Sequence, residues 1–276
     1  MGLNQDYHIL TRARAEELRL LLREASERER TSTFVIEGPH LIERGFEAAP
    51  ERIKEIYFIG EDDLTGGLRV RPTIAPILRH AKERNIRSYQ ITVKMAERIS
   101  DTKTPQGIFA LVAMPDKDDA LPKEGIVIAL DDVQDPGNVG AIIRTAAWFG
   151  AKQILLSKEC ADPYSPKVLR ATQGEIFSTK VGIRGELKNK LVYLHSKGFQ
   201  VVAATLDPAA CSLYKMAFAQ NVVIVFGSEA HGVSSEILKV ADGQIIVPKF
   251  GAGESLNVAT SVGIILSEIM RSRVGF

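Results

Sequence analysis

The feature that most constrains the fold is a regular alternation of short apolar runs and longer helical segments in the second half of the chain. The predicted strands are residues 125–130, 152–157, 176–182, 199–204, 222–226 and 243–247. The predicted helices are residues 137–149, 166–172, 186–197, 233–239 and 255–272. Continuous apolar strands such as VVIVF are typical of a parallel sheet that is covered on both faces. The pattern therefore predicts an α/β domain with a mostly parallel sheet.

The first strand of this domain leads into a polar turn and an otherwise apolar helix. Residues 135–137 are Asp-Pro-Gly, Asn138 stands at the helix entrance, and Arg144 follows six residues later. Ligands of parallel sheets bind beyond the carboxyl ends of the strands, so both side chains are candidates for a site. An arginine among Ala, Ile and Thr is costly to bury unless it meets an anion. A structural salt bridge is the alternative role for Arg144.

A second polar segment, GSEAHGVSSEI, follows the strand 222–226. Gly227 ends the strand, and Glu229 lies in the turn before Gly232. At this strand terminus Glu229 is placed either to orient a substrate or to cap backbone amides, and spacing does not decide between the two.

The third polar segment follows the strand 243–247 and begins the last helix. Gly251 and Gly253 allow backbone angles that other residues avoid, which predicts a loop that curls around a ligand. Ser255 is predicted to cap the helix, and Asn257 in its first turn to point into the cleft. The alternative is an ordinary glycine-rich connection with a serine cap.

The common nucleotide-binding and catalytic motifs do not occur in the chain. GAGESL lacks the third glycine of the dinucleotide fingerprint, and no GK[ST] phosphate loop occurs. Cys160, Cys211 and the five histidines have no metal-ligand spacing. The spacing therefore predicts a ligand-binding α/β domain with five candidate polar residues and no metal, but it does not specify a reaction.

The first part of the chain has the pattern of a small α/β sandwich, with elements in the order β-α-β-α-β. Its predicted elements are a helix in 11–30, a strand at 33–38, a helix from Pro39, a strand at 53–59, a helix at 73–84, a helix capped by Thr92 and a strand at 107–114. A polar, aspartate-rich stretch follows. Nothing in 1–115 resembles an acid/base or metal constellation, so a binding role is favoured over a catalytic one. We therefore predict a binding domain at 1–115, a linker at 116–124 and the main domain at 125–276.

The charge of the chain is unevenly distributed, although its net charge is only +1. Residues 69–103 contain nine Lys/Arg and three Asp/Glu, whereas residues 33–63 contain three and eight. The basic segment predicts a phosphate-contacting face, with Arg84 and Arg87 as candidate RNA contacts. A solvated helix surface is the alternative.

Composition suggests where the protein acts. The residues are 45% hydrophobic, the start of the chain has no apolar segment like that of a signal peptide, and no run of about 18 apolar residues occurs. We expect a cytoplasmic protein that does not bind a membrane.

Three motifs of this chain resemble those of the SpoU (TrmH-like) family of S-adenosylmethionine-dependent RNA ribose 2′-O-methyltransferases, within the SPOUT class. They are NVGAIIRTAAWFGA, FGSEAHGVS and IIVPKFGAGESLNVATSVGIILSE, in that order. Residues 160–177 are similar to the family segment between the first two motifs. The segments EGPHLIERGFEAA and TPQGIFALV resemble the L30e-like domain that many members place in front.

The resemblance implies a carboxyl-terminal trefoil knot, a bent S-adenosylmethionine (AdoMet) cofactor and a homodimer whose interface completes the site. Matched by position, the cofactor contacts are Thr205, Gly227, Val247 and Leu256, and the catalytic set is Arg144, Asn138, Glu229, Ser255 and Asn257. Members often have Met and then a small residue after the strand-ending proline, whereas this chain has Lys249 and Phe250.

The expected reaction is methyl transfer to a ribose 2′-OH in structured RNA, with large-subunit (23S) ribosomal RNA as the first candidate substrate and tRNA as the second. A non-catalytic RNA-binding protein on the same scaffold is an alternative from a different class. A small-molecule enzyme with a Rossmann-like sheet is disfavoured by the missing fingerprint and by the additional basic domain.

Overall fold

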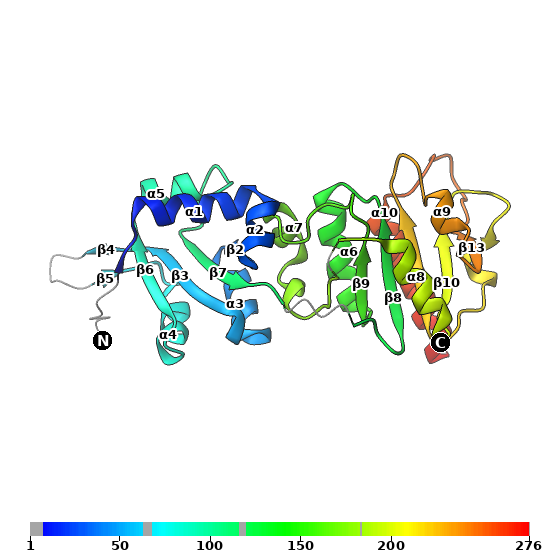
Figure 1. The fold of residues 1–276 in the computed structure, drawn as a ribbon, viewed down its shortest axis with the longest axis horizontal. Coiled ribbons are helices and arrows are strands. Elements are labelled where there is room, and N and C mark those ends of the chain that lie inside the picture. Colours follow the sequence, from blue (N-terminus) through cyan, green and yellow to red (C-terminus); the bar gives the residue numbers. More distant parts are fainter. Residues whose placement is uncertain (1–7, 63–67, 116–119, 183, 276) are drawn as a thin grey trace. The chain divides into compact units, whose positions relative to one another are not determined.

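A computed structural model describes residues 8–62, 68–115, 120–182 and 184–275 (Figure 1). The chain divides into two compact units. The first contains the described residues up to 115 together with Tyr164–Phe177, and the second contains residues 120–163 and the described residues from Ser178 onwards. The predicted linker 116–124 lies partly outside the described residues. In the described ranges, no helix is both long and apolar enough to span a bilayer.

The first unit has a five-stranded mixed sheet in the order β1-β6-β3-β7-β2. These strands are β1 (His8–Ile9), β2 (Thr33–Glu37), β3 (Ile53–Ile59), β6 (Arg87–Ile91) and β7 (Ile108–Ala113). A separate hairpin pairs β4 (Glu61–Asp62) with β5 (Leu68–Arg69). Because β7 runs antiparallel to β2 and β3, whereas β6 is parallel to β3, the strands run in both directions.

Helices cover both faces of this sheet (Figure 1). They are α1 (Arg12–Arg23), α2 (Ala25–Thr31), α3 (Pro39–Ala48), α4 (Ala75–Glu83) and α5 (Val93–Ile99), with a short 3₁₀ turn at Pro50–Arg52. Leu18 of α1 and Ile99 of α5 pack with Tyr57 and Phe109 of the sheet in one buried cluster. Burial of such side chains is the main driving force that holds helices to a sheet.

Two details of the first unit differ from the sequence prediction. The helix predicted over 11–30 is broken at Glu24, whose extended backbone separates α1 from α2. The basic segment contains a strand, β6, that was predicted neither as strand nor as helix, because its polar residues lack clear alternation. The predicted cap of α5 is confirmed, since Thr92 Oγ1 accepts a hydrogen bond from Met95 N at 3.2 Å.

Residues Tyr164–Phe177 belong to the first unit, whereas the sequence prediction placed them in the second domain. This segment contains α7 (Pro166–Thr172) and a 3₁₀ turn at Glu175–Phe177. The ring of Tyr164 lies 4.8 Å from that of Phe34, centroid to centroid, and Glu175 forms an ion pair with Arg44 at 3.1 Å. The strand predicted at 176–182 is wrong: beyond the 3₁₀ turn, only an isolated bridge joins Val181 to Ile154 in the described part of this range.

The second unit has a six-stranded sheet in the order β11-β13-β10-β12-β8-β9, and each neighbouring pair is parallel. The strands are β8 (Ile126–Asp131), β9 (Gln153–Leu156), β10 (Gln200–Ala204), β11 (Cys211–Ser212), β12 (Val222–Gly227) and β13 (Gly243–Ile246). The predicted parallel α/β sheet is therefore confirmed.

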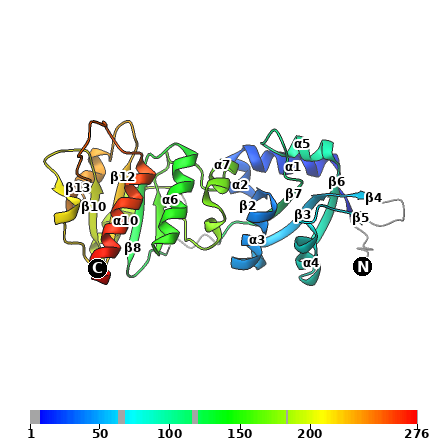
Figure 2. The same cartoon turned by 180° about the vertical axis from the view of Figure 1, so that it is seen from behind.

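Helices cover both faces of this sheet as well. Helices α6 (Pro136–Trp148) and α10 (Val258–Val274) lie side by side on one face (Figure 2). Helices α8 (Leu187–Ser196) and α9 (Ser235–Leu238) pack on the other, where Leu191 and Ile237 join a cluster with Val201 and Val223 of the strands. A short 3₁₀ turn, Leu213–Lys215, follows β11. Because all six strands are parallel, their carboxyl ends meet at one edge of the sheet.

Candidate active site

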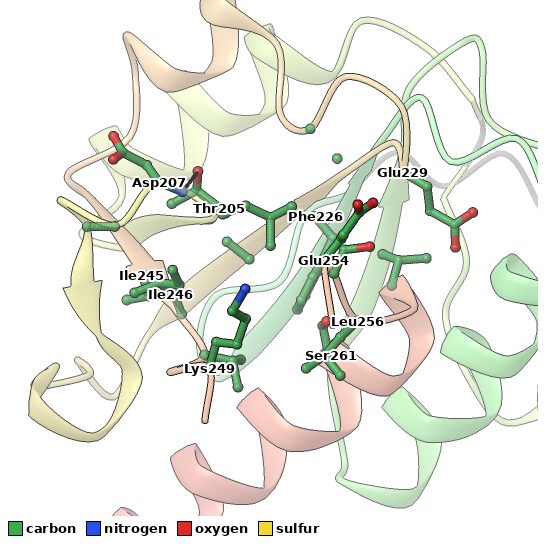
Figure 3. A pocket seen from close by; sticks show the side chains of 18 of the residues that line it. Thr205, Asp207, Phe226, Glu229, Ile245, Ile246, Lys249, Glu254, Leu256 and Ser261 are labelled. Atoms are coloured by element: carbon green, nitrogen blue, oxygen red, sulfur yellow. Dashed lines mark hydrogen bonds between the residues drawn. The ribbon is translucent and has the colours of Figure 1, made fainter. Parts of the chain in front are cut away.

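A cavity of about 1330 Å³ lies at the carboxyl ends of three adjacent strands, β10, β12 and β13 (Figure 3). Its wall consists of the segments that follow these strands and the first turns of α10, in which Ser261 and Ile265 line it. The loops after β10 and β13 are joined at their base, because Thr205 N donates a hydrogen bond to Ile245 O at 2.9 Å. Two segments separated by 40 residues of sequence thus form one wall.

Gly227 lies where the chain folds back across the end of β12. Gly232 N donates to Ser228 O at 2.9 Å and closes the turn. A Cβ atom added to Gly227 would lie 1.9 Å from Gly232 C and 2.2 Å from Val233 N, which are backbone atoms. Only glycine fits here, because any side chain would displace the turn that carries Glu229.

Asn138, Glu229 and Asn257 form a hydrogen-bonded network from three distant segments. Asn138 Nδ2 donates to Glu229 Oε1 at 2.9 Å, and Asn257 Nδ2 donates to Asn138 Oδ1 at 2.9 Å and to Glu229 Oε1 at 3.2 Å. The side chains come from the start of α6, the turn after β12 and the start of α10. The structure thus brings together three of the five predicted polar residues.

Asn257, and not Ser255, caps the last helix. Asn257 Oδ1 accepts hydrogen bonds from Ala259 N at 2.9 Å and from Thr260 N at 3.3 Å, and α10 begins at Val258. The prediction of a Ser255 cap is therefore wrong, because the loop continues for two more residues. Ser255 is exposed and lines the cavity.

Arg144 stands outside the cavity wall on α6. The guanidinium is exposed, and within the described chain it forms neither a hydrogen bond nor an ion pair. The structural salt bridge considered from the sequence is thus not observed among these residues. Arg144 is available to an anion that arrives from solvent.

The loop between β13 and α10 does not adopt the backbone conformation that its glycines suggested. Neither Gly251 nor Gly253 has a positive φ, and a Cβ atom on either would meet no atom within 4 Å. The backbone freedom that these glycines offer is therefore not used in this structure, although both residues line the cavity. That the loop curls around a ligand stays a prediction.

All four predicted cofactor contacts line the cavity. They are Thr205, Gly227, Val247 and Leu256. Sequence reasoning missed Asp207 and Glu254, whose carboxylates also line it together with that of Glu229 (Figure 3). Asp207 follows the end of β10 by three residues, and proximity to a strand end was the signal that could have identified it.

The charge of the lining favours a cationic ligand. Lys249 carries the single ammonium or guanidinium group among the described lining residues, which also include Asp207, Glu229 and Glu254. Acidic walls attract a positive group and repel free phosphate. No group of three or more metal-ligating side chains occurs within the described ranges.

Arg84 and Arg87 lie in the first unit and differ in their surroundings. Arg84 ends α4, with its guanidinium 5.7 Å from the ring centroid of Phe46. Arg87 is exposed at the first position of β6. Both residues are exposed, and Arg84 in addition contacts an aromatic ring of its own unit.

Comparison with known proteins agrees with this architecture. Residues 125–267 match the SpoU rRNA Methylase family, and residues 17–110 match the MRM3-like substrate binding domain. The 23S rRNA (guanosine(2553)-2′-O)-methyltransferase RlmP of Bacillus subtilis is 32% identical over 240 residues, which cover 87% of this chain and 89% of that protein.

Two further proteins align over nearly their whole length. The 23S rRNA (uridine(2479)-2′-O)-methyltransferase of Streptomyces viridochromogenes is 26% identical in sequence. The alignment covers 95% of this chain and 91% of that protein. The crystal structure of an AdoMet-bound rRNA methyltransferase from Sinorhizobium meliloti is 27% identical, covers 96% of this chain and 97% of its own, and superimposes with a TM-score of 0.80. The chain therefore belongs to the SpoU rRNA methylase family.

Proposed function

We propose that this protein transfers a methyl group from AdoMet to a ribose 2′-OH in large-subunit ribosomal RNA. The observation that carries the proposal is the network of Asn138, Glu229 and Asn257 beside a cavity lined by all four expected cofactor contacts. The Bacillus subtilis and Streptomyces relatives are 23S rRNA 2′-O-methyltransferases that act on a guanosine and a uridine, respectively. The relatives therefore share a ribose target and differ in the base.

The cavity residues suit AdoMet. Thr205, Gly227, Val247 and Leu256 would hold its adenosine portion, and the carboxylates of Asp207, Glu229 and Glu254 favour its positive charge. When bound, AdoMet supplies a methyl group on a positively charged sulfur. This chain's residues must then orient the 2′-OH in line with that methyl group.

Arg144 is assigned to the RNA. Its exposed guanidinium contacts the phosphate beside the target ribose and stabilises the negative charge that develops on the 2′-oxygen. It acts by orientation and charge, because a guanidinium has only donors and no acceptor and is therefore a poor general base. Asn138 and Asn257 fix the Glu229 carboxylate at the cavity, and Ser255 contacts the incoming nucleotide from the loop.

The active protein is a homodimer in which a second copy covers α6. Trp148 is 85% exposed and lies four residues after Arg144, on the same side of the helix. An exposed tryptophan of this size favours an apolar partner surface. Covering it places Arg144 beside the interface, so that the second copy completes the RNA-binding side of the site.

The finer features of the fold are part of the same proposal. The first unit serves as the L30e-like RNA-binding domain, supported by its mixed sheet, its helices on both faces and its basic segment. The carboxyl-terminal segment forms a trefoil knot. The support for this is that the chain belongs to a family in which the segment around the Asn257 motif is knotted.

The test is methyl transfer from tritiated AdoMet to unmodified 23S rRNA, with unmodified tRNA in parallel and mapping of ribose methylation in the product. Transfer to 23S rRNA and not to tRNA is expected. Arg144→Ala should reduce turnover about 100-fold or more, the size typical of a lost charge-stabilising donor, while AdoMet affinity stays unchanged. Near-normal turnover would refute the role of Arg144, and RNA binding without transfer would favour the non-catalytic alternative.

A further inference from the structure

The loop between β13 and α10 carries the most exposed large apolar side chain in the described part of the chain. Phe250 is 90% exposed, and it lines the cavity together with its neighbour Lys249. Such a side chain is informative where it lines a cavity together with other exposed apolar groups, because groups of this kind mark ligand-binding surfaces.

Among residues 120–163, 178–182 and 184–275 of the second unit, no contact that covers this position is observed. A Cβ atom on the neighbouring Gly251, or on Gly253 in the same loop, would meet no atom within 4 Å. The loop is held at its far end by Asn257, which caps α10 through two hydrogen bonds. Phe250 thus projects from a loop that is anchored but open.

Exposed apolar side chains and carboxylates both line this cavity. Leu206, from the loop after β10, is 65% exposed, and Leu256, which is also an expected cofactor contact, is 46% exposed; both line the cavity, as Phe250 does. The carboxylates of Asp207, Glu229 and Glu254 disfavour a phosphate in the same space. The exposed apolar side chains therefore suit a flat, uncharged group that arrives from solvent, which is the chemistry of a nucleobase.

We propose that Phe250 is the platform on which a base of the RNA substrate stacks at the mouth of the cavity. This assignment rests on the proposed RNA methyltransferase function. Proteins recognise splayed RNA nucleotides by stacking their bases on aromatic side chains. Three of the four expected AdoMet contacts, Thr205, Gly227 and Val247, lie at or next to strand ends, whereas Phe250 lies four residues beyond the end of β13 and is almost wholly exposed. The fourth, Leu256, lies in the same loop as Phe250, so the experiment measures AdoMet affinity as well as RNA affinity to separate the two ligands.

The experiment compares Phe250→Ala, Phe250→Leu and Phe250→Trp with the unchanged protein. Initial rates of methyl transfer are measured against the concentration of unmodified 23S rRNA, and the dissociation constant of AdoMet is measured by calorimetry. Loss of one base–aromatic stack corresponds to a rise in the KM for RNA of roughly ten-fold. Phe250→Ala should show this rise in the KM for RNA. Phe250→Leu should show it too, because leucine keeps apolar volume but has no π face. Phe250→Trp keeps an aromatic face, so its KM for RNA should equal that of the unchanged protein.

Tyr214 provides the matched control. It is also an exposed aromatic residue of the second unit, 55% exposed, but it does not line the cavity. Tyr214→Ala should leave the KM for RNA and the AdoMet affinity within about two-fold of the unchanged protein, since it lies outside the stack.

Three outcomes would overturn the assignment. An unchanged KM for RNA in Phe250→Ala would exclude a stack. A loss of AdoMet affinity as large as the loss of RNA affinity would show that Phe250 covers the cofactor. A change in the mass measured by light scattering would show that Phe250 is a subunit contact. Absence of methyl transfer by the unchanged protein would instead contradict the proposed function. In that case, direct binding of the same rRNA by the Phe250 variants still tests the stack.

Discussion

At the end of β12, Gly227 lies closer to the backbone of Gly232 and Val233 than any side chain permits. Gly227→Ala should therefore displace the turn with Glu229, lower the stability by about 3 kcal/mol or more, and abolish AdoMet binding. Thermal unfolding and calorimetry measure both effects. Gly253→Ala is the stability control, because its Cβ atom meets nothing within 4 Å and its φ is not positive. Equal melting temperatures for the two variants would contradict the assigned constraint.

Asn257 combines a structural and a functional role in one side chain. Its Oδ1 caps α10, while its Nδ2 donates to Asn138 and Glu229. Asn257→Ala should lose about 1 kcal/mol of stability together with activity, because both sets of bonds vanish. Asn257→Ser keeps a cap but not the amide donor, so it should retain stability and still lose methyl transfer. Urea unfolding and transfer assays separate the roles, and full activity in Asn257→Ser would show that the donor is dispensable.

Among the elements of the first unit, β2 is tied to the loop before β7 through a buried carboxylate. Glu37 is 5% exposed and accepts hydrogen bonds from Ser100 Oγ at 2.7 Å and from Gln106 N at 2.8 Å. Burial raises the pKa of Glu37, and Asp101 adds to this rise, while the two hydrogen bonds and Arg170 oppose it. The folded chain therefore holds this proton more tightly than the unfolded chain does.

The sign of the resulting pH dependence follows from linkage. The contribution of Glu37 to the free energy of unfolding is greatest below its ordinary pKa and declines as the pH rises through the raised value. Glu37→Gln cannot ionise, so its stability should decline less over that range in urea unfolding between about pH 4 and pH 8. Glu43→Gln, at an exposed position of α3, is the control. Parallel pH profiles for the unchanged protein and Glu37→Gln would exclude this effect.

Arg84, at the end of α4, and Arg87, at the start of β6, are the two candidate RNA contacts of the basic segment. Both are exposed, and the guanidinium of Arg84 also lies over the Phe46 ring. Arg87→Glu should weaken binding to 23S rRNA and leave AdoMet affinity unchanged. The slope of log RNA affinity against log salt concentration should become shallower by about one. Arg84→Glu should also cost about 0.5–1 kcal/mol of stability through the lost cation–π contact. Binding across a salt series measures this, and an equal loss of AdoMet and RNA affinity would count against an RNA-contacting face.

For the whole molecule, the proposed dimer makes activity depend on assembly. Trp148→Glu should give a folded monomer without methyl transfer, because the charge prevents burial of α6 against a second copy. Light scattering measures the mass, and circular dichroism checks the fold. Tyr193→Glu, at a 51% exposed position on α8, is the control and should remain dimeric and active. A monomeric and active unchanged protein would contradict the proposed dimer.

The sequence predicted much of the second unit because local patterns specify it. Continuous apolar runs and intervening helical periods identified the parallel sheet. In the segment that belongs to the first unit, the helix at Pro166–Thr172 also has the predicted bounds. The three motifs identified the SpoU family, which the comparisons confirm. The prediction failed where local signals compete. One helix was predicted over 11–30, but it is broken at Glu24 within a continuous helical pattern. Ser255 was predicted to cap the last helix, but Asn257, which is an equally good cap by residue type, does so.

The sequence by itself determined the strand–helix alternation, the family and the residue types available for chemistry, because these depend on neighbouring residues and on motif spacing. Only the tertiary structure decided that Asn138, Glu229 and Asn257 share hydrogen bonds, that Gly227 admits no side chain and that Tyr164–Phe177 packs on the first unit. The first and the third depend on contacts between segments far apart in the chain, whereas the second depends on how the chain folds back across the end of β12. The physical reason is that sheet order and side-chain packing, which local propensity does not encode, set those contacts.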